Sequence, residues 1–196
     1  MQIKQKEYGV ISIKSLKSNK LTVQEICSIG LFVAIIAVCA QISFPIFPNG
    51  VPMTLQTFAI PLAGVVLGAK NGMIAALVYV LLGMVGVPVF AGFTGGIGIV
   101  FGRTGGFILA FPFMAFAAGI GAKKDNLAWL VLWLTIGAVV LYTVGMLVFS
   151  LVAPAALWAS FTLVVVPFLP TEVIKIVLVI LFGKLINKAL KFRGMS

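Results

Sequence analysis

Histidine is absent from this 196-residue chain, and acidic residues number four. The commonest general base and metal ligand is therefore missing. Glu172 is the one carboxylate away from the basic segments, which excludes paired-carboxylate catalysis and a hard-metal cage. No serine or cysteine has a plausible base beside it. The sequence thus predicts a protein that is not an enzyme and that holds no metal or cofactor.

Two further absences narrow the function. The chain has no G-x-x-x-x-G-K-[ST] phosphate loop, so we expect that it cannot hydrolyse ATP by itself. Its two cysteines, Cys27 and Cys39, are twelve residues apart on one predicted helix. That spacing separates them by roughly 18 Å, too far for a disulfide bond.

Charge is scarce and hydrophobicity is high. Charged residues make up 9% of the chain and hydrophobic residues 62%, with a mean hydropathy of +1.23. Soluble domains carry about 25% charged residues, so an integral membrane protein is predicted. The net charge of +10 could indicate nucleic-acid binding, but basic residues held on the cytoplasmic face are the favoured explanation, and no nucleic-acid partner is expected.

Apolar runs divide the chain into six predicted transmembrane helices, which makes the fold class all-α. A span needs roughly 20 apolar residues. The second and third runs are shorter and are separated only by Lys70 and Asn71, which predicts a tight helical hairpin at the membrane surface. The predicted spans are 24–42, 54–69, 71–87, 104–122, 127–152 and 168–190.

The basic residues set the predicted orientation. With a cytoplasmic N-terminus, all Lys and Arg residues except Arg103 and Lys175 fall on the inner side of six crossings. Both termini are therefore expected in the cytoplasm of a multi-pass plasma-membrane protein. We divide the chain into a basic N-terminal tail, 1–23, and a six-helix transmembrane substrate-binding domain, 24–196.

Irregular chain is concentrated on the predicted outer side, in segments 43–54, 86–106 and 153–171. These segments are rich in Gly and Pro yet apolar. Non-helical backbone at membrane depth is tolerated only where it is buried in protein or lines a cavity. We expect these outer loops to cap a substrate pocket, where Gly95 and Gly96 let the backbone approach a ligand closely. Helix breaking and close packing are the alternative role for any single glycine.

The outer charges are the first candidate ligand contacts. Glu172 and Lys175 share a face about one turn apart, and an ionisable group inside an apolar helix indicates a functional site. Arg103 precedes the fourth predicted helix. The alternatives are a local ion pair for the first two residues and a headgroup anchor for Arg103. One uncompensated positive charge would favour an anionic solute, whose carboxylate we expect to meet Lys175 or Arg103.

Other residues are predicted to complete the pocket. Hydrogen-bonding groups come from the second predicted span and the loop before it, and aromatic side chains supply apolar walls. The polar candidates are Thr54, Gln56, Thr57 and Asn49, and the aromatic ones are Phe90, Phe93, Tyr79 and Tyr142.

The first predicted helix carries a stripe of small residues that includes Gly30, Ala34 and Ala37. Small residues at this spacing let two membrane helices approach closely. We predict that the stripe docks a partner protein. Packing of the first helix within its own chain is the alternative.

Several motifs, in order and at compatible spacing, resemble the BioY family of biotin-specific substrate-binding (S) components of energy-coupling factor (ECF) transporters. They are Val51-Pro-Met-Thr-Leu-Gln-Thr-Phe58, Leu62-Ala-Gly-Val-Val-Leu-Gly68, Gly86-Val-Pro-Val-Phe-Ala-Gly92, Thr104-Gly-Gly106 and Pro167-Phe-Leu-Pro-x-Glu-x-x-Lys175.

The resemblance implies a six-helix prokaryotic protein that captures biotin from outside. Its partners would be a transmembrane coupling protein and two ABC ATPases, with the small-residue stripe contacting the coupling protein. An S component for another vitamin, a membrane scaffold without a ligand, and a stand-alone carrier remain alternatives.

Overall fold

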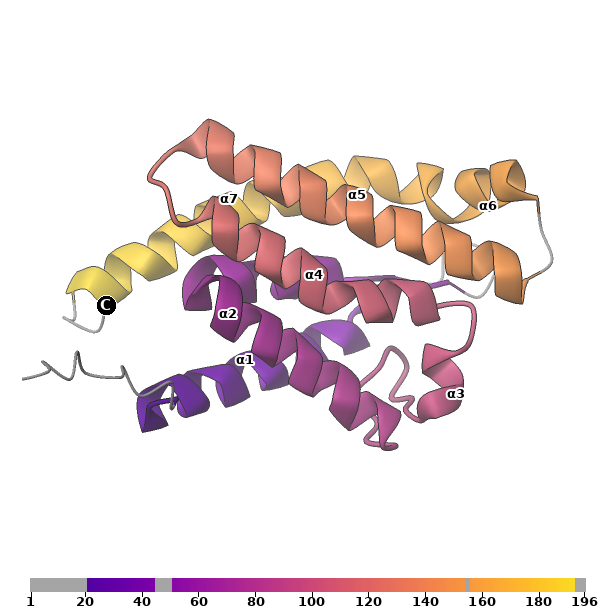
Figure 1. Ribbon diagram of the computed structural model, residues 1–196, viewed down its shortest axis with the longest axis horizontal. Coiled ribbons are helices and arrows are strands. Elements are labelled where there is room, and N and C mark those ends of the chain that lie inside the picture. The colour runs from indigo at the N-terminus through magenta and orange to yellow at the C-terminus, as the bar shows by residue number, and fades with distance from the viewer. Residues whose placement is uncertain (1–20, 45–50, 154–155, 193–196) are drawn as a thin grey trace, which may run out of the picture.

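The computed structural model describes residues 21–44, 51–153 and 156–192, and this part of the chain is mostly helical (Figure 1). The long helices run side by side. They are α1 (Val23–Gln41), α2 (Gln56–Met84), α4 (Gly105–Gly121), α5 (Leu127–Val152) and α7 (Leu169–Phe192). The short elements are α3 (Ile97–Val100), α6 (Leu157–Val164), the 3-10 helix η1 (Val166–Phe168), and the antiparallel strands β1 (Ser43–Phe44) and β2 (Met53–Thr54).

Helical segments long and apolar enough to cross a membrane agree with the predicted class. Within the described residues they are Val23–Gln41, Gln56–Met84, Leu127–Val152 and Leu157–Ala189, with Gly105–Gly121 as a shorter apolar helix. Large apolar side chains such as Leu31, Phe113 and Val173 are exposed on these helices, as a lipid-facing surface requires. A helical membrane fold is therefore confirmed.

Local capping explains two of the helix starts. Thr22 and Glu25 form a reciprocal capping box at the start of α1. The Asn126 side chain accepts a 3.1 Å hydrogen bond from the backbone N–H of Trp129 at the start of α5. Both helices begin within one residue of the predicted bounds.

The predicted helical hairpin lies within α2, but its turn is two residues earlier than expected. Gly68 has φ 80° and ψ 170°, which interrupts the helix. Gly72 then packs against Gly64, a contact that a straight helix would not allow, since eight residues span roughly 12 Å. The chain turns at Gly68 rather than at Lys70–Asn71 because glycine takes a positive φ with little strain.

Segment 153–171 was predicted to be irregular chain, but the structure shows that much of it is helical. It contains α6 and η1, with Pro167 inside η1. The apolar run Leu157–Val164 has no proline or glycine, so nothing in it prevents a helix. Trp158 stacks on Phe161 along this short helix, with ring centroids 5.7 Å apart.

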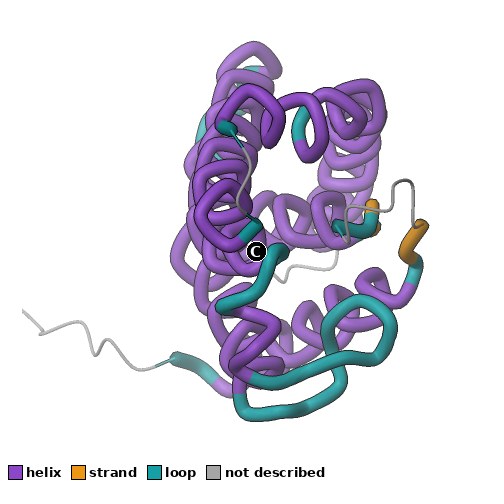
Figure 2. Tube along the Cα trace, turned by 90° about the vertical axis from the view of Figure 1, so that its right-hand side faces the viewer, coloured by secondary structure: helices purple, strands orange, loops and turns teal. Residues whose placement is uncertain are grey.

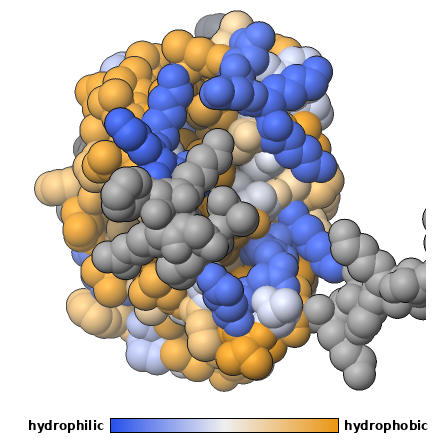
Figure 3. Space-filling view, turned by 90° about the vertical axis from the view of Figure 1, so that its left-hand side faces the viewer, coloured by the Kyte–Doolittle hydropathy of each residue, from blue (hydrophilic) through white to orange (hydrophobic). Residues whose placement is uncertain are grey.

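The two ends of the molecule differ. The start of α1, the α4–α5 turn and the end of α7 lie together at the left of Figure 1, and hydrophilic side chains gather there (Figure 3). Loops, both strands, α3 and α6 gather at the opposite end (Figure 2). Exposed lysines belong to the first end: Lys70, Lys123, Lys124, Lys184 and Lys188. We call the end with these lysines the lysine end and the opposite end the loop end. The predicted tail 1–23 lies almost entirely outside the described residues.

Candidate functional site

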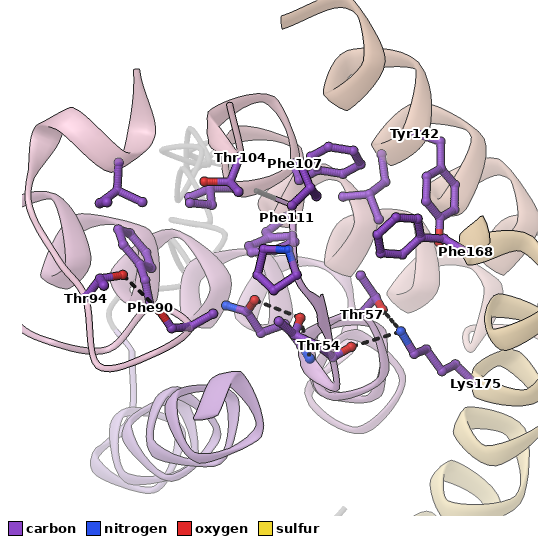
Figure 4. Close-up of a pocket in the computed structure, with 17 residues that line it drawn as sticks. Thr54, Thr57, Phe90, Thr94, Thr104, Phe107, Phe111, Tyr142, Phe168 and Lys175 are labelled. Atoms are coloured by element: carbon purple, nitrogen blue, oxygen red, sulfur yellow. Dashed lines mark hydrogen bonds between the residues drawn. The ribbon is translucent and has the colours of Figure 1, made fainter. Parts of the chain in front are cut away.

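A cavity of about 270 Å³ lies between the helices near the loop end (Figure 4). Its walls come from β2, the first turn of α2, the loop after α2, α3, the first half of α4, α5, η1 and α7. The lining residues are Val51, Pro52, Thr54, Gln56, Thr57, Phe90, Ala91, Thr94, Ile99, Thr104, Phe107, Ile108, Phe111, Leu141, Tyr142, Phe168 and Lys175. The volume is close to the lower end of the range for small-ligand pockets, about 300–1,000 Å³.

Lys175 reaches the cavity from α7 and is 5% exposed. Its Nζ donates a 2.9 Å hydrogen bond to the carbonyl oxygen of Thr54 and a 2.6 Å hydrogen bond to Oγ1 of Thr57 (Figure 4). An ammonium group has three N–H donors, so these two bonds leave one for a ligand. Lys175 therefore binds α2 and β2 and still offers a cationic donor at the cavity wall.

Glu172 lies one turn before Lys175 on α7 and is 4% exposed. Its Oε2 accepts a 3.0 Å hydrogen bond from the hydroxyl of Tyr142, a lining residue on α5. Its Oε1 is buried and has no hydrogen-bond partner within the part of the chain that the structure describes. A buried carboxylate oxygen without a donor is costly, so Glu172 keeps one unsatisfied acceptor next to a residue that lines the cavity.

A second polar group lies at the start of α2. Thr54 donates a 2.9 Å hydrogen bond from its hydroxyl to Oε1 of Gln56, and the Gln56 amide donates to the hydroxyl of Tyr79. Tyr79 in turn donates a 2.9 Å hydrogen bond to the carbonyl oxygen of Val89. Gln56 lines the cavity, whereas Tyr79 is fully buried behind it. Tyr79 therefore supports the wall from behind.

Aromatic side chains form most of the remaining wall. Phe107 and Phe168 pack against Tyr142, with ring centroids 6.3 Å and 6.4 Å away. Phe90 meets Tyr79 edge-on at 5.6 Å. The result is a mainly apolar cavity with a few polar side chains, as ligand pockets commonly have.

The structure brings together seven of the predicted site residues and places others elsewhere. Thr54, Gln56, Tyr142 and Lys175 line the cavity, and Glu172 is hydrogen-bonded to one of these lining residues. Thr57 and Phe90, named as supporting candidates, also line it. Asn49 lies outside the described residues.

Arg103, Phe93, Gly95 and Gly96 do not line the cavity. Arg103 is exposed in the turn before α4, and Phe93 is 72% exposed. Gly95 packs against the backbone of Gly86 and Val87, so close packing accounts for it. Gly96 takes a φ of 107° just before α3, where glycine permits the chain direction.

Sequence reasoning missed Phe107 and Phe111, which line the cavity from α4. They are four residues apart and follow Thr104-Gly-Gly, so one helix face carries both. That spacing could have predicted that both side chains face the same neighbour. Val51, Pro52 and Phe168 were missed because an apolar residue in an apolar chain carries no mark of its position.

The stripe of small residues on α1 lies on the outer surface. Gly30 and Ala34 are exposed and Ala37 is half-buried. A side chain added at Gly30 would meet nothing within 4 Å. The buried face of α1 is a different one, formed by Ile29, Phe32, Val33, Ile36 and Ala40.

The chemistry of the site suits binding rather than catalysis. Within the described ranges, no group of three His, Cys, Asp or Glu side chains could hold a metal ion. The cavity offers one cationic donor, an amide and hydroxyls beside an aromatic wall, and the carboxylate of Glu172 lies behind the lining residue Tyr142. It fits a small molecule with one polar, hydrogen-bonding end and an apolar body.

The chain is similar in sequence to a known protein family and to several of its members. The BioY family model matches residues 14–192. A probable biotin transporter BioY of Pyrococcus horikoshii is 44% identical over 154 residues, which cover 78% of this chain and 89% of that protein. The biotin transporter BioY of Thermotoga maritima is 37% identical over 166 residues, covering 84% and 96%.

The fold is similar to a solved structure as well. The crystal structure of the S-component for biotin from an ECF-type ABC transporter has a TM-score of 0.78 to this chain and 26% sequence identity, covering 86% of this chain and 95% of that one. Together with the apolar helices, the bacterial and archaeal relatives indicate a multi-pass membrane protein. The match over nearly the whole chain shows that this protein is a member of the BioY family, a family of transport proteins rather than enzymes.

Proposed function

We propose that this protein captures biotin on the outer side of the plasma membrane, as the S component of an ECF-type importer. The observation that carries the proposal is the cavity near the loop end, where Lys175 and Glu172 are buried beside an aromatic wall. Burying two ionisable groups in an apolar bundle costs free energy, and ionisable groups in such positions commonly belong to a functional site.

The distribution of charge supports the proposal that the cavity opens on the outer side of the membrane. The exposed lysines lie at the lysine end, and the positive-inside rule assigns that end to the cytoplasm. The start of α1 and the end of α7 lie at the same end (Figure 1), as an even number of crossings requires. The cavity then lies near the outer surface.

The cavity chemistry favours one orientation of biotin. The ureido ring of biotin carries N–H donors and a carbonyl acceptor, while its valeryl chain ends in a carboxylate. Oε1 of Glu172 can accept from a ureido N–H, and the remaining N–H of Lys175 can donate to the ureido oxygen. A carboxylate placed there would meet the like charge of Glu172 one helical turn away, so we infer that the valeryl carboxylate points toward the outer mouth.

Transport itself requires partners. The chain lacks a phosphate loop, so we propose that a transmembrane coupling protein and two ABC ATPases supply the energy. The stripe of Gly30, Ala34 and Ala37, of which the first two are exposed, is a surface where another apolar helix could pack closely.

Mass spectrometry and calorimetry test the proposal. The protein is purified in detergent after expression in biotin-containing medium, and any ligand that it releases is identified by mass. Ligand-free protein is then titrated with biotin, thiamine and riboflavin. We expect biotin to be released and to bind in preference to the other two vitamins.

Preferential binding of thiamine or riboflavin would assign the protein to another vitamin. Lack of binding to all three would favour a scaffold. A stand-alone carrier would accumulate biotin in cells that lack the partner ATPases, so uptake in such cells would contradict the role of the partners.

A further inference from the structure

Gln41, the last residue of α1, connects that helix to the loop between α2 and α3. Its Nε2 lies 3.2 Å from the carbonyl oxygens of Ala37 and Phe90 and 3.4 Å from that of Val89. The nitrogen carries two N–H donors, so one of them is shared between two of these acceptors. Its Oε1 accepts a 2.9 Å hydrogen bond from the N–H of Phe93. One amide therefore serves backbone donors and acceptors on both sides of a turn.

The turn that Gln41 holds, residues 90–94, has an unfavourable backbone. Phe93 has a φ of 55°, a left-handed conformation that is uncommon for a bulky aromatic residue. Gly92 precedes it with a φ of 70°, and the Phe90 N–H donates to the Thr94 carbonyl at 2.9 Å to close the turn. Such a conformation persists only where surrounding contacts maintain it.

The same turn forms a wall of the cavity. Phe90, Ala91 and Thr94 are lining residues. The carbonyl oxygen of Val89 receives hydrogen bonds from both Gln41 and Tyr79, and Tyr79 is bound by the lining residue Gln56. The position of this wall thus depends on hydrogen bonds from α1 and from α2.

We propose that Gln41 is a positioning residue for ligand binding, which holds the turn at 90–94 in the shape that closes the cavity. It does not touch the cavity itself. This inference rests on the proposed function, since the ligand used to test it is biotin. The chemistry calls for an amide, because the turn presents carbonyl acceptors and an N–H donor to one side chain.

Two substitutions test the hydrogen bonds of the Gln41 amide, one by removing its donor and the other by removing both donor and acceptor. Gln41→Glu keeps the shape and the acceptor but replaces the donor with a negative charge beside three carbonyl oxygens. Gln41→Leu keeps similar bulk and removes both donor and acceptor. Gln24 is exposed in the first turn of α1, so Gln24→Glu and Gln24→Leu make the same chemical changes on the same helix, far from the cavity.

The experiment uses the full chain in detergent and has two measurements. Hydrogen–deuterium exchange of ligand-free protein reports on the peptide that contains residues 86–96. Biotin dissociation is followed by displacement of labelled biotin. In both Gln41 variants we expect exchange in residues 89–94 to be about tenfold faster and biotin to dissociate about tenfold faster, with association much less changed. The Gln24 variants should match the wild type in both measurements.

Unchanged exchange in the turn, or faster exchange with an unchanged biotin dissociation rate, would overturn the proposal. Faster exchange throughout α1, α2 and α4 in both variants would also overturn it, because that pattern reports general destabilisation. If the wild type does not bind biotin, the proposed function fails instead, and the exchange measurement still decides whether Gln41 holds the turn.

Discussion

Lys175 on α7 donates a 2.9 Å hydrogen bond to the backbone carbonyl oxygen of Thr54, a residue 121 positions earlier in the chain. Because Thr57 accepts a second bond from the same ammonium group, the start of α2 and the first half of α7 are joined by one buried cation. The same side chain lines the cavity. Lys175 therefore joins two segments of the fold and lines the cavity in which we propose that the ligand binds.

Replacing Lys175 with methionine should weaken biotin binding by about tenfold or more, since a charge-assisted hydrogen bond contributes about 1.5–3 kcal/mol. Methionine keeps the bulk of the side chain but has no donor. Isothermal titration calorimetry measures the affinity. The matched control is Lys188→Met, at an exposed lysine on the same helix near the lysine end. Equal affinities in the two variants would contradict a role for Lys175 in binding.

Glu172→Gln tests the carboxylate without removing its hydrogen bond to Tyr142, because an amide oxygen also accepts. We expect the affinity for biotin to fall by about tenfold, since the acceptor offered to the ureido N–H loses its charge. Tyr142→Phe should have a smaller effect, because it leaves the carboxylate in place. A Glu172→Gln variant that binds as tightly as the wild type would show that the ligand does not use this oxygen.

The proposed orientation of biotin predicts that its carboxyl-amide binds nearly as well as biotin, within about threefold. The valeryl carboxylate then faces the mouth, and converting it to a neutral amide removes no contact with Lys175. A loss of about a hundredfold, close to 2.8 kcal/mol, would instead place the carboxylate at Lys175.

Arg103→Ala is a second test: Arg103 is exposed and does not line the cavity, so we expect less than about a threefold change in affinity.

The small-residue stripe on α1 predicts a separation of binding from uptake. Ala34→Leu adds bulk on the exposed face of α1, where it should prevent close helix packing with the coupling protein. We expect biotin affinity to stay within about twofold of wild type, while biotin uptake in cells that contain the partner ATPases is lost. Ala128→Leu, the same change at an exposed site on α5, should leave uptake intact. Uptake at the wild-type level in Ala34→Leu would argue against docking through this stripe.

Two glycines with open space around them should respond to alanine in opposite directions. Gly68 has φ 80° and ψ 170°, a conformation adopted essentially only by glycine, so Gly68→Ala adds backbone strain of about 1–3 kcal/mol and lowers the melting temperature. Gly30 lies in the middle of α1, where Gly30→Ala should stabilise the helix by about 0.5–1 kcal/mol. Thermal unfolding in detergent measures both. A melting temperature that does not fall in Gly68→Ala would mean that the turn in α2 tolerates another conformation.

Much of the fold could be predicted from the chain alone. The fifth predicted span, 127–152, coincides with α5, and the first differs from α1 by one residue at each end. These bounds depend on apolar runs, caps and breakers that are close together in the sequence. The hairpin at 54–87 was also predictable. Its turn was misplaced because polar residues mark the membrane surface, whereas the reversal requires the positive φ of Gly68.

The candidate site was predictable only in part. Glu172 and Lys175 were recognised because charge is rare inside an apolar helix, and the same rarity drew attention to Arg103. The structure buries the first two and exposes the third, a difference that depends on which way each element faces. Sequence spacing reports the face of one helix, but not which other helix covers that face.

The sequence by itself determined that this is a helical membrane protein of the BioY family, with two ionisable residues one turn apart on its last helix. The tertiary structure alone decided that Lys175 joins Thr54 and Thr57, that Tyr142 binds Glu172, and that Gln41 holds the turn at 90–94. The physical reason is the range of the interactions. Whether a segment crosses the bilayer depends on its own apolar residues and flanking charges. A hydrogen bond between distant segments, by contrast, exists only after packing brings donor and acceptor within about 3 Å.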